Sequence, residues 1–175
     1  MEIGKPFFRK RRFSDSIPAF TCTVRIYKIP VSILVIIHTS DMQVLLLERA
    51  DHPGYWQSVT GSRNEDETLV QTAVREVAEE TGLDASRYEL TDWNIVNEYE
   101  IYEEWRWRYA PEVTHNTEHV FGLLVPQPVP VSVAAREHLR HAWLPWQEAA
   151  EKVFSPSNAE AIRRLAAVGD KGSKG

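Results

Sequence analysis

The sequence predicts an α/β protein in which a mixed β-sheet is covered by helices. Residues 31–39 and 43–49 are rich in Val, Ile and Leu and have the length of buried strands. An amphipathic helix pattern over residues 68–81 follows, and further strand and helix patterns come after it. Strands on both sides of a helix, with more helix at the C-terminal end, favour a sheet with helical layers.

The first half of the chain reads as two strands and a short extended segment. Asp41-Met42 separates the two strands, and Pro53-Gly54 marks a loop after the second. Residues 56–60 are extended and lead into Gly61, which opens the loop before the helix.

The helix expected over residues 68–81 carries glutamates on one side and apolar residues on another. At about 100° of rotation per residue, Glu79 and Glu80 lie within roughly 60° of Glu76. The separate apolar stripe is formed by Val70, Ala73, Val74 and Val77. Gly82 stands where a left-handed C-terminal cap is expected.

The second half of the chain continues with strands, a proline-rich loop and two helices. We expect one or two strands over residues 88–102 with a break near Asn97, strands over 118–125 and 140–144, and helices over 146–153 and 158–167. Ser157 is suited to cap the last helix.

The composition is that of one globular domain of 175 residues with a net charge of −5. Cys22 is the only cysteine, which excludes an intrachain disulfide and fits a cytoplasmic location. No apolar run reaches the roughly 18 residues of a membrane span, so no membrane contact is expected. The acidic balance also argues against nucleic acid as a partner, and the oligomeric state stays open.

The two ends of the chain differ from its centre. Residues 1–28 carry seven basic and two acidic side chains. We expect a basic, disordered extension over residues 1–26, a globular domain over 27–168 and a flexible tail over 169–175. A targeting or polyanion-binding role for the basic cluster at residues 9–12 is the alternative.

The glutamates of the helix indicate a site for divalent cations. Like charges at i,i+3 and i,i+4 repel each other on a helix, so Glu76, Glu79 and Glu80 favour a bound cation that compensates them. The alternative is a solvated acidic face. Mg²⁺ prefers oxygen ligands, and at such a site it would neutralise substrate phosphates and activate water. Arg75 either orients a neighbouring carboxylate or lies exposed.

The segment from Gly61 to Leu83 fits a longer pattern at every fixed position: Gly, five residues, Glu, seven residues, Arg-Glu-apolar-any-Glu-Glu-any-Gly-apolar. In this the chain resembles the Nudix hydrolases. The resemblance implies an α/β/α sandwich, hydrolysis of a phosphoanhydride and dependence on Mg²⁺, with Mn²⁺ as a possible substitute. It also implies catalytic or metal-binding roles for Arg75, Glu76, Glu79 and Glu80.

Four other segments, residues 27–35, 55–62, 108–118 and 137–139, resemble the bacterial branch of this family that acts on dihydroneopterin triphosphate. That branch releases pyrophosphate in folate synthesis and also hydrolyses dATP-like nucleotides. The resemblance therefore implies a pterin or nucleoside triphosphate as the small-molecule partner. The chain departs from the branch at Asp66, in a loop outside the ligands, and around residues 103–107. The second departure leaves the preference between pterin and purine open.

The same resemblance assigns residues by position. It implies that Glu76, Glu80 and Glu137 are metal ligands, with Glu79 as a further candidate and Glu137 as a candidate base. The implied substrate contacts are Lys28, Arg49, Thr60, Tyr99, Glu100, Ile101 and Tyr102. Lys28 and Arg49 suit phosphate oxygens, and Tyr99 or Tyr102 suits stacking on a flat ring. Packing within the sheet is the alternative for the tyrosines.

Two other functions remain open from the sequence. The first is a house-cleaning pyrophosphatase that acts on ordinary or modified dNTPs. The second is a ligand sensor without catalysis, which is disfavoured because all box glutamates are retained.

Overall fold

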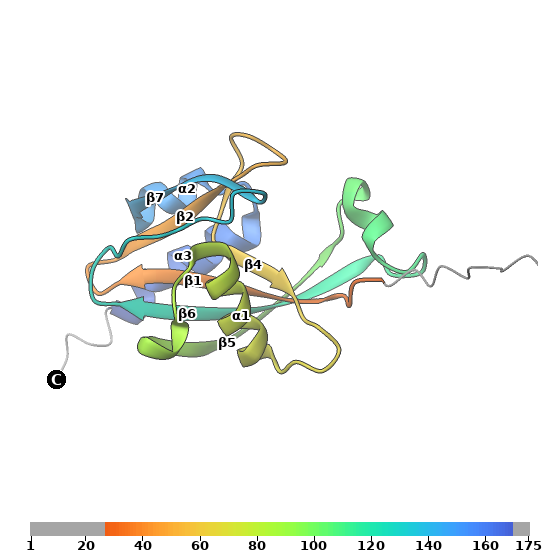
Figure 1. Ribbon diagram of the computed structural model, residues 1–175, viewed down its shortest axis with the longest axis horizontal. Helices are drawn as coiled ribbons and strands as arrows, with labels where there is room; N and C mark the ends of the chain where they lie inside the picture. The colour runs from red at the N-terminus through yellow and green to blue at the C-terminus, as the bar shows by residue number, and fades with distance from the viewer. Residues whose placement is uncertain (1–26, 170–175) are drawn as a thin grey trace, which may run out of the picture.

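The computed structural model describes residues 27–169 (Figure 1). The expected basic extension over residues 1–26, and residues 170–175 of the expected tail, lie outside the described residues. The strands are β1 (Val31–Thr39), β2 (Gln43–Arg49), β3 (Trp56–Gln57), β4 (Val59–Ser62), β5 (Glu89–Glu100), β6 (His115–Val125) and β7 (His138–Pro145). The helices are α1 (Leu69–Thr81), α2 (Trp146–Lys152) and α3 (Pro156–Gly169), with short 3₁₀ helices η1 (Ala85–Arg87) and η2 (Glu103–Arg108).

The strands form a mixed sheet in the order β3-β2-β1-β6-β5, with β4 paired to β1 and β7 paired to β2. β1 and β6 are parallel along their length, from Val31 opposite Thr117 to Thr39 opposite Val125. The other pairs are antiparallel. The predicted mixed sheet is therefore confirmed.

Two hydrophobic cores lie on opposite faces of this sheet. Ile33, Val35 and Ile37 of β1 pack on one face with apolar residues of α1. Leu34 and Ile36 point to the other face and pack with residues of α2 and α3. Because successive side chains of a strand point to opposite faces, the uninterrupted apolar run of β1 supplies both cores. The helices on the two faces complete an α/β/α sandwich (Figure 1).

The centre of the sheet divides into two halves. β1 and β2 pair at His38 and Val44 next to their turn. Beyond that point β4 lies along β1 and β3 lies along β2. The segment expected to be one extended piece is thus two strands with different partners, and Ser58 lies where the chain crosses between them.

α1 begins and ends as the sequence predicts. Thr68 is the N-cap, and its side chain and that of Gln71 form a capping box. Gly82 ends the helix with φ 71°, a left-handed conformation that glycine adopts without strain.

Two local predictions were wrong. The irregularity in β5 lies between Asp92 and Ile95, where Asn94 has φ 54°, and not near Asn97. Ser157 does not cap α3, because that helix begins one residue earlier at Pro156. Proline is favoured at the first helical position, because an N–H group there would have no partner within the helix.

Two strands are longer than expected: β6 begins at His115, and β7 spans His138–Pro145.

Candidate active site

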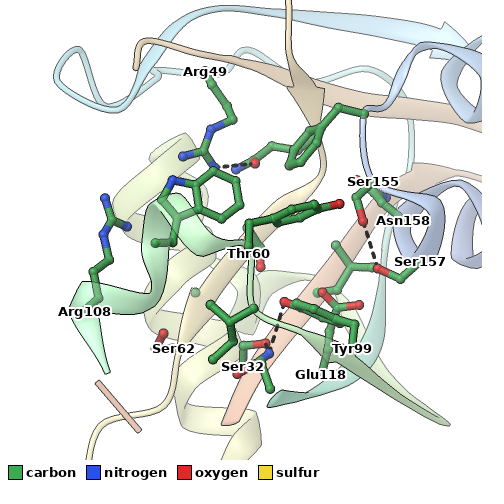
Figure 2. Close-up of a pocket in the computed structure, with 18 of the residues that line it drawn as sticks. Ser32, Arg49, Thr60, Ser62, Tyr99, Arg108, Glu118, Ser155, Ser157 and Asn158 are labelled. Carbon is green, nitrogen blue, oxygen red and sulfur yellow. Dashed lines mark hydrogen bonds between the residues drawn. The ribbon is translucent and has the colours of Figure 1, made fainter. Parts of the chain in front are cut away.

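A cavity of about 700 Å³ opens where the two halves of the sheet separate. Its lining comes from both sides of the molecule. Glu80 and Glu137 belong to the side covered by α1, whereas Phe154 and Asn158 belong to the α2–α3 side. Figure 2 shows Thr60 in the middle, with Arg49 and Arg108 toward one end and Glu118 toward the other. The volume is within the range of about 300–1,000 Å³ that small-molecule sites occupy.

The three clustered glutamates of α1 do not share one environment. Glu76 and Glu80 are buried, whereas the side chain of Glu79 is 58% exposed. The side chain of Glu76 lies directly against Gly61: a Cβ added there would stand 1.9 Å from its carboxyl carbon. Gly61 is therefore required for the approach of the Glu76 carboxylate to the sheet.

Arg75 binds the acidic side chains around it. Its guanidinium holds Glu67 through two hydrogen bonds of 2.6 and 2.9 Å, and also contacts Glu76 at 2.7 Å and Glu79 at 3.1 Å. These contacts lower the pKa of Glu67 to about 2, with the hydrogen bonds from Arg75 as the main cause. Part of the charge compensation that a cation was expected to supply therefore comes from Arg75. The orienting role is the alternative that this geometry favours.

Glu80, Glu137 and His138 form a cluster whose ligand atoms lie within 4.8 Å of one another. Glu80 Oε2 lies 3.2 Å from His138 Nε2. Neither atom has a hydrogen-bond partner among the described residues, and neither does His138 Nδ1. Burial raises the pKa of Glu80 to about 7, against the opposing effect of His138.

This cluster fits a divalent cation. Buried oxygen and nitrogen atoms without partners are costly in a folded protein, and a cation would satisfy the carboxylate oxygen and an unprotonated ring nitrogen. Oxygen donors from Glu80 and Glu137 suit a hard ion of the magnesium type. Burial also raises the pKa of Glu76, one helical turn before Glu80, which is a further carboxylate suited to a cation.

Basic side chains line the cavity near these carboxylates. Lys28, Arg49, Arg108 and Arg136 all contribute to the wall. The pKa of Lys28 is lowered, mainly by burial and then by the neighbouring Arg108. Arg49 is held by Asp51 at 2.6 and 2.8 Å and by Gln57 at 2.9 Å. Such a wall suits a polyphosphate chain.

The predicted substrate contacts all line the cavity, but their surroundings differ. Thr60 Oγ1 donates to the Ile33 carbonyl at 2.9 Å. The Tyr99 hydroxyl accepts from Asn116 at 3.1 Å, so this ring is held in the sheet. Ile101 is buried and Glu100 is exposed. Tyr102 is 47% exposed and packs edge-on against Trp105.

Sequence reasoning missed several residues of the cavity. The aromatic ring of Trp105 lies 5.0 Å from the guanidinium carbon of Arg49, in cation–π geometry. The polar side chains of Asn116, Glu118 and Ser157 form part of the wall. No sequence pattern predicted the 3₁₀ helix η2, which contains Trp105. Glu118 is predicted only as the first residue of a strand, and both Asn116 and Glu118 fall in the segment 108–118 that resembles the bacterial branch, without an assigned role.

Among the described residues, no helix is both long and apolar enough to cross a membrane.

Comparisons with known proteins agree with this geometry. The family model of the NUDIX domain matches residues 28–165. The dihydroneopterin triphosphate diphosphatase of Escherichia coli K12 is 46% identical over 144 residues, which covers 81% of this chain and 95% of that protein. The enzyme of the same name from Haemophilus influenzae is 44% identical over 142 residues, covering 79% of this chain and 88% of the relative. The solved structure of the E. coli dihydroneopterin triphosphate pyrophosphohydrolase superposes with a TM-score of 0.74 and covers 79% of this chain and 96% of that one.

Proposed function

The chain belongs to the Nudix hydrolase family, and on that premise we propose that it hydrolyses dihydroneopterin triphosphate to the monophosphate and pyrophosphate. The observation that carries this proposal is the single cavity that brings acidic, basic and ring-binding side chains together. Glu80 and Glu137 line this cavity together with basic residues and with the polar side chains of Asn116, Glu118 and Ser157. The identity of 44–46% to enzymes named for this substrate supports the same assignment.

We assign the metal to Glu76, Glu80 and Glu137, and we propose Mg²⁺ as the physiological ion, with Mn²⁺ as a substitute. When bound, such an ion neutralises phosphate charge and lowers the pKa of water. Glu79 stays a predicted member of this set. Its exposed side chain and its contact with Arg75 fit a supporting role in the charge balance.

The side chains of the cavity have separate tasks in this reaction. Water attacks a phosphorus atom of the triphosphate, the bond to the bridging oxygen breaks, and pyrophosphate leaves. A carboxylate takes the proton of the attacking water, and Glu137 is the candidate because it is exposed to the cavity beside Glu80. Lys28 and Arg49 hold phosphate oxygens, so that the chain stays in line with the attacking water.

The proposal is tested by turnover of purified protein with Mg²⁺ on dihydroneopterin triphosphate and dATP, with identification of the products. We expect a higher kcat/KM for the pterin substrate and release of pyrophosphate. Glu80→Gln should lower kcat by about 100-fold or more, because several kcal/mol of charge stabilisation are lost. Glu151→Gln on the exposed face of α2 is the matched control and should leave turnover unchanged.

Three outcomes would contradict parts of this assignment. A higher kcat/KM for dATP would favour the house-cleaning function over the pterin function. An effect of Glu137→Gln on KM alone would argue against its role as the base. Absence of pyrophosphate release from every triphosphate tested would favour a sensor without catalysis.

A further inference from the structure

The floor of the cavity is polar where the rest of the sheet is apolar. Ser32 of β1 stands opposite Glu118 of β6, and Glu118 stands opposite Asn97 of β5. Two residues earlier on β6, Asn116 stands opposite Tyr99. These five side chains come from three neighbouring strands and gather at one end of the sheet.

Glu118 lies at the boundary between this floor and the hydrophobic core. It is 4% exposed, and Val120, two residues further on the same side of β6, is completely buried in the core against α3. The carboxylate accepts a hydrogen bond from Asn97 Nδ2 at 3.1 Å and one from the Ser157 hydroxyl. Both partners are neutral. Within residues 27–169, Glu118 forms no ion pair with a Lys, Arg or His side chain.

A carboxylate in this position is costly for the fold alone. Burying an ionised group without a cation costs several kcal/mol, even where neutral hydrogen bonds remain. Burial raises the pKa of Glu118 in agreement with this. A glutamine or an apolar residue would be cheaper in the same space. The carboxylate therefore needs another explanation, and it lines the cavity.

The floor offers acceptors, so a ligand there must bring donors. Asn116 uses its amide nitrogen on Ser32 at 2.7 Å and on Tyr99, whereas its buried Oδ1 has no partner among the described residues. Asn116 and Glu118 both line the cavity, so acceptor oxygens belong to its wall. A carboxylate pairs best with two parallel N–H donors, as it does with the fork of a guanidinium.

One ring edge has this pair of donors. The 2-amino-4-oxopyrimidine ring of a pterin carries N3–H beside an exocyclic 2-amino group, and guanine carries the same edge. Adenine has no ring N–H beside its amino group. Figure 2 shows Glu118 beside Tyr99 and Ser157, away from Arg49 and Arg108. A ring at Glu118 would thus point its phosphates toward the basic wall.

We propose that Glu118 determines ring specificity by accepting hydrogen bonds from N3–H and the 2-amino group of a 2-amino-4-oxopyrimidine ring. This inference rests on the proposed function, because it assigns the ring end of the same cavity. Asn97 and Ser157 are positioning residues that hold the carboxylate. Each well-made bidentate pair of this kind discriminates by about 1–3 kcal/mol, which is about 5- to 150-fold.

The decisive experiment changes the hydrogen-bonding groups both of the ligand and of residue 118. We would measure binding of neopterin and of the matching 2-oxo compound, a lumazine, by ligand fluorescence in the full-length protein. A lumazine presents N3–H beside a carbonyl, which matches the acceptor and donor of a glutamine amide. The unmodified protein should prefer the pterin, and Glu118→Gln should shift the preference toward the lumazine by about 10-fold or more. Glu98→Gln, on an exposed position of β5, is the matched control and should bind like the unmodified protein.

Measurements of turnover and stability distinguish a role of Glu118 in ring recognition from a role in the fold alone. Glu118→Gln should lose kcat/KM for dihydroneopterin triphosphate and for dGTP, keep that for dATP, and retain or increase its Tm. An unchanged ligand preference would overturn the proposal. Loss of folding, or equal loss of all three activities with a lowered Tm, would overturn it as well, because the carboxylate would then be structural. A pterin preference that Glu118 controls, without turnover of the pterin triphosphate, would contradict the proposed function and leave this inference intact.

Discussion

At the scale of single residues, the site depends on carboxylates held in unfavourable surroundings. Glu80 is 3% exposed and faces His138, whereas Glu79 on the same helix is exposed and paired with Arg75. Burial raises the pKa of Glu80, whereas Arg75 lowers that of Glu67. α1 and the loop before it therefore contain acids whose pKa values are shifted in opposite directions, and only the buried ones need a cation or a proton.

The pKa of Glu80 has a consequence for stability. The folded value of about 7 lies above the ordinary 4.5, so the folded protein binds a proton that the unfolded chain releases. Protonation of Glu80 therefore stabilises the folded protein fully below about pH 4.5, and this contribution is lost as the pH rises through 7. In EDTA, the free energy of unfolding should therefore fall over this window, by at most about 3 kcal/mol, relative to Glu80→Gln. Added Mg²⁺ should restore stability at high pH.

Chemical denaturation at pH 5, 6, 7 and 8 checks this prediction. Glu79→Gln is the control, because its exposed carboxylate should leave the pH dependence as it is. The prediction would be contradicted if the free energy of unfolding in EDTA depended on pH in the same way for the unmodified protein and for Glu80→Gln.

At the scale of elements, the cavity depends on the crossing between β3 and β4. Asn158 of α3 accepts from the Ser58 backbone N–H at 2.8 Å and donates to the Ser58 hydroxyl at 2.9 Å. Both residues are buried, and they are 100 positions apart. This pair fixes α3 to the point where the sheet divides, and Ser157 beside it contacts Glu118.

Asn158→Ala should therefore destabilise the protein and disturb ring binding together. It leaves the buried Ser58 N–H without a partner, which costs about 1–3 kcal/mol. We expect this loss in chemical denaturation, with a higher KM for the pterin substrate and a smaller effect on kcat. Gln147→Ala, an exposed amide on α2, should change stability by less than about 0.5 kcal/mol. A loss of kcat at unchanged KM would assign Asn158 to the chemistry instead.

The elements also explain what the sequence could predict. β1, β2 and α1 have strong local patterns, and their bounds agree with the predicted ones to within one residue. The caps and the box glutamates are local features as well. The role of Glu118 is not local, because it follows from the register of β6 against β1 and β5. The start of α3 was predicted wrongly although its signals are local. Pro156 allows the helix to begin earlier than a serine cap at position 157 suggests.

At the scale of the whole molecule, the two faces of the sheet carry different parts of the reaction. The carboxylates of α1 approach from one face, where Gly61 allows Glu76 to lie against β4. The polar floor and the segment before α3 belong to the other face. The divergence of β1 and β2 opens a cavity that is lined from both sides. On the proposed assignment, the fold separates phosphate chemistry from ring recognition.

This arrangement predicts which part of the chain suffices for activity. Among residues 27–169, those that line the cavity lie between Lys28 and Asn158. A variant that lacks residues 1–26 should therefore keep its kcat/KM for dihydroneopterin triphosphate and its Tm. A variant that lacks residues 1–30 also loses Lys28, and its KM should rise by about tenfold, as expected for one charged phosphate contact. Equal losses in both variants would assign a binding role to the basic residues before position 27 and would contradict the proposed domain boundary.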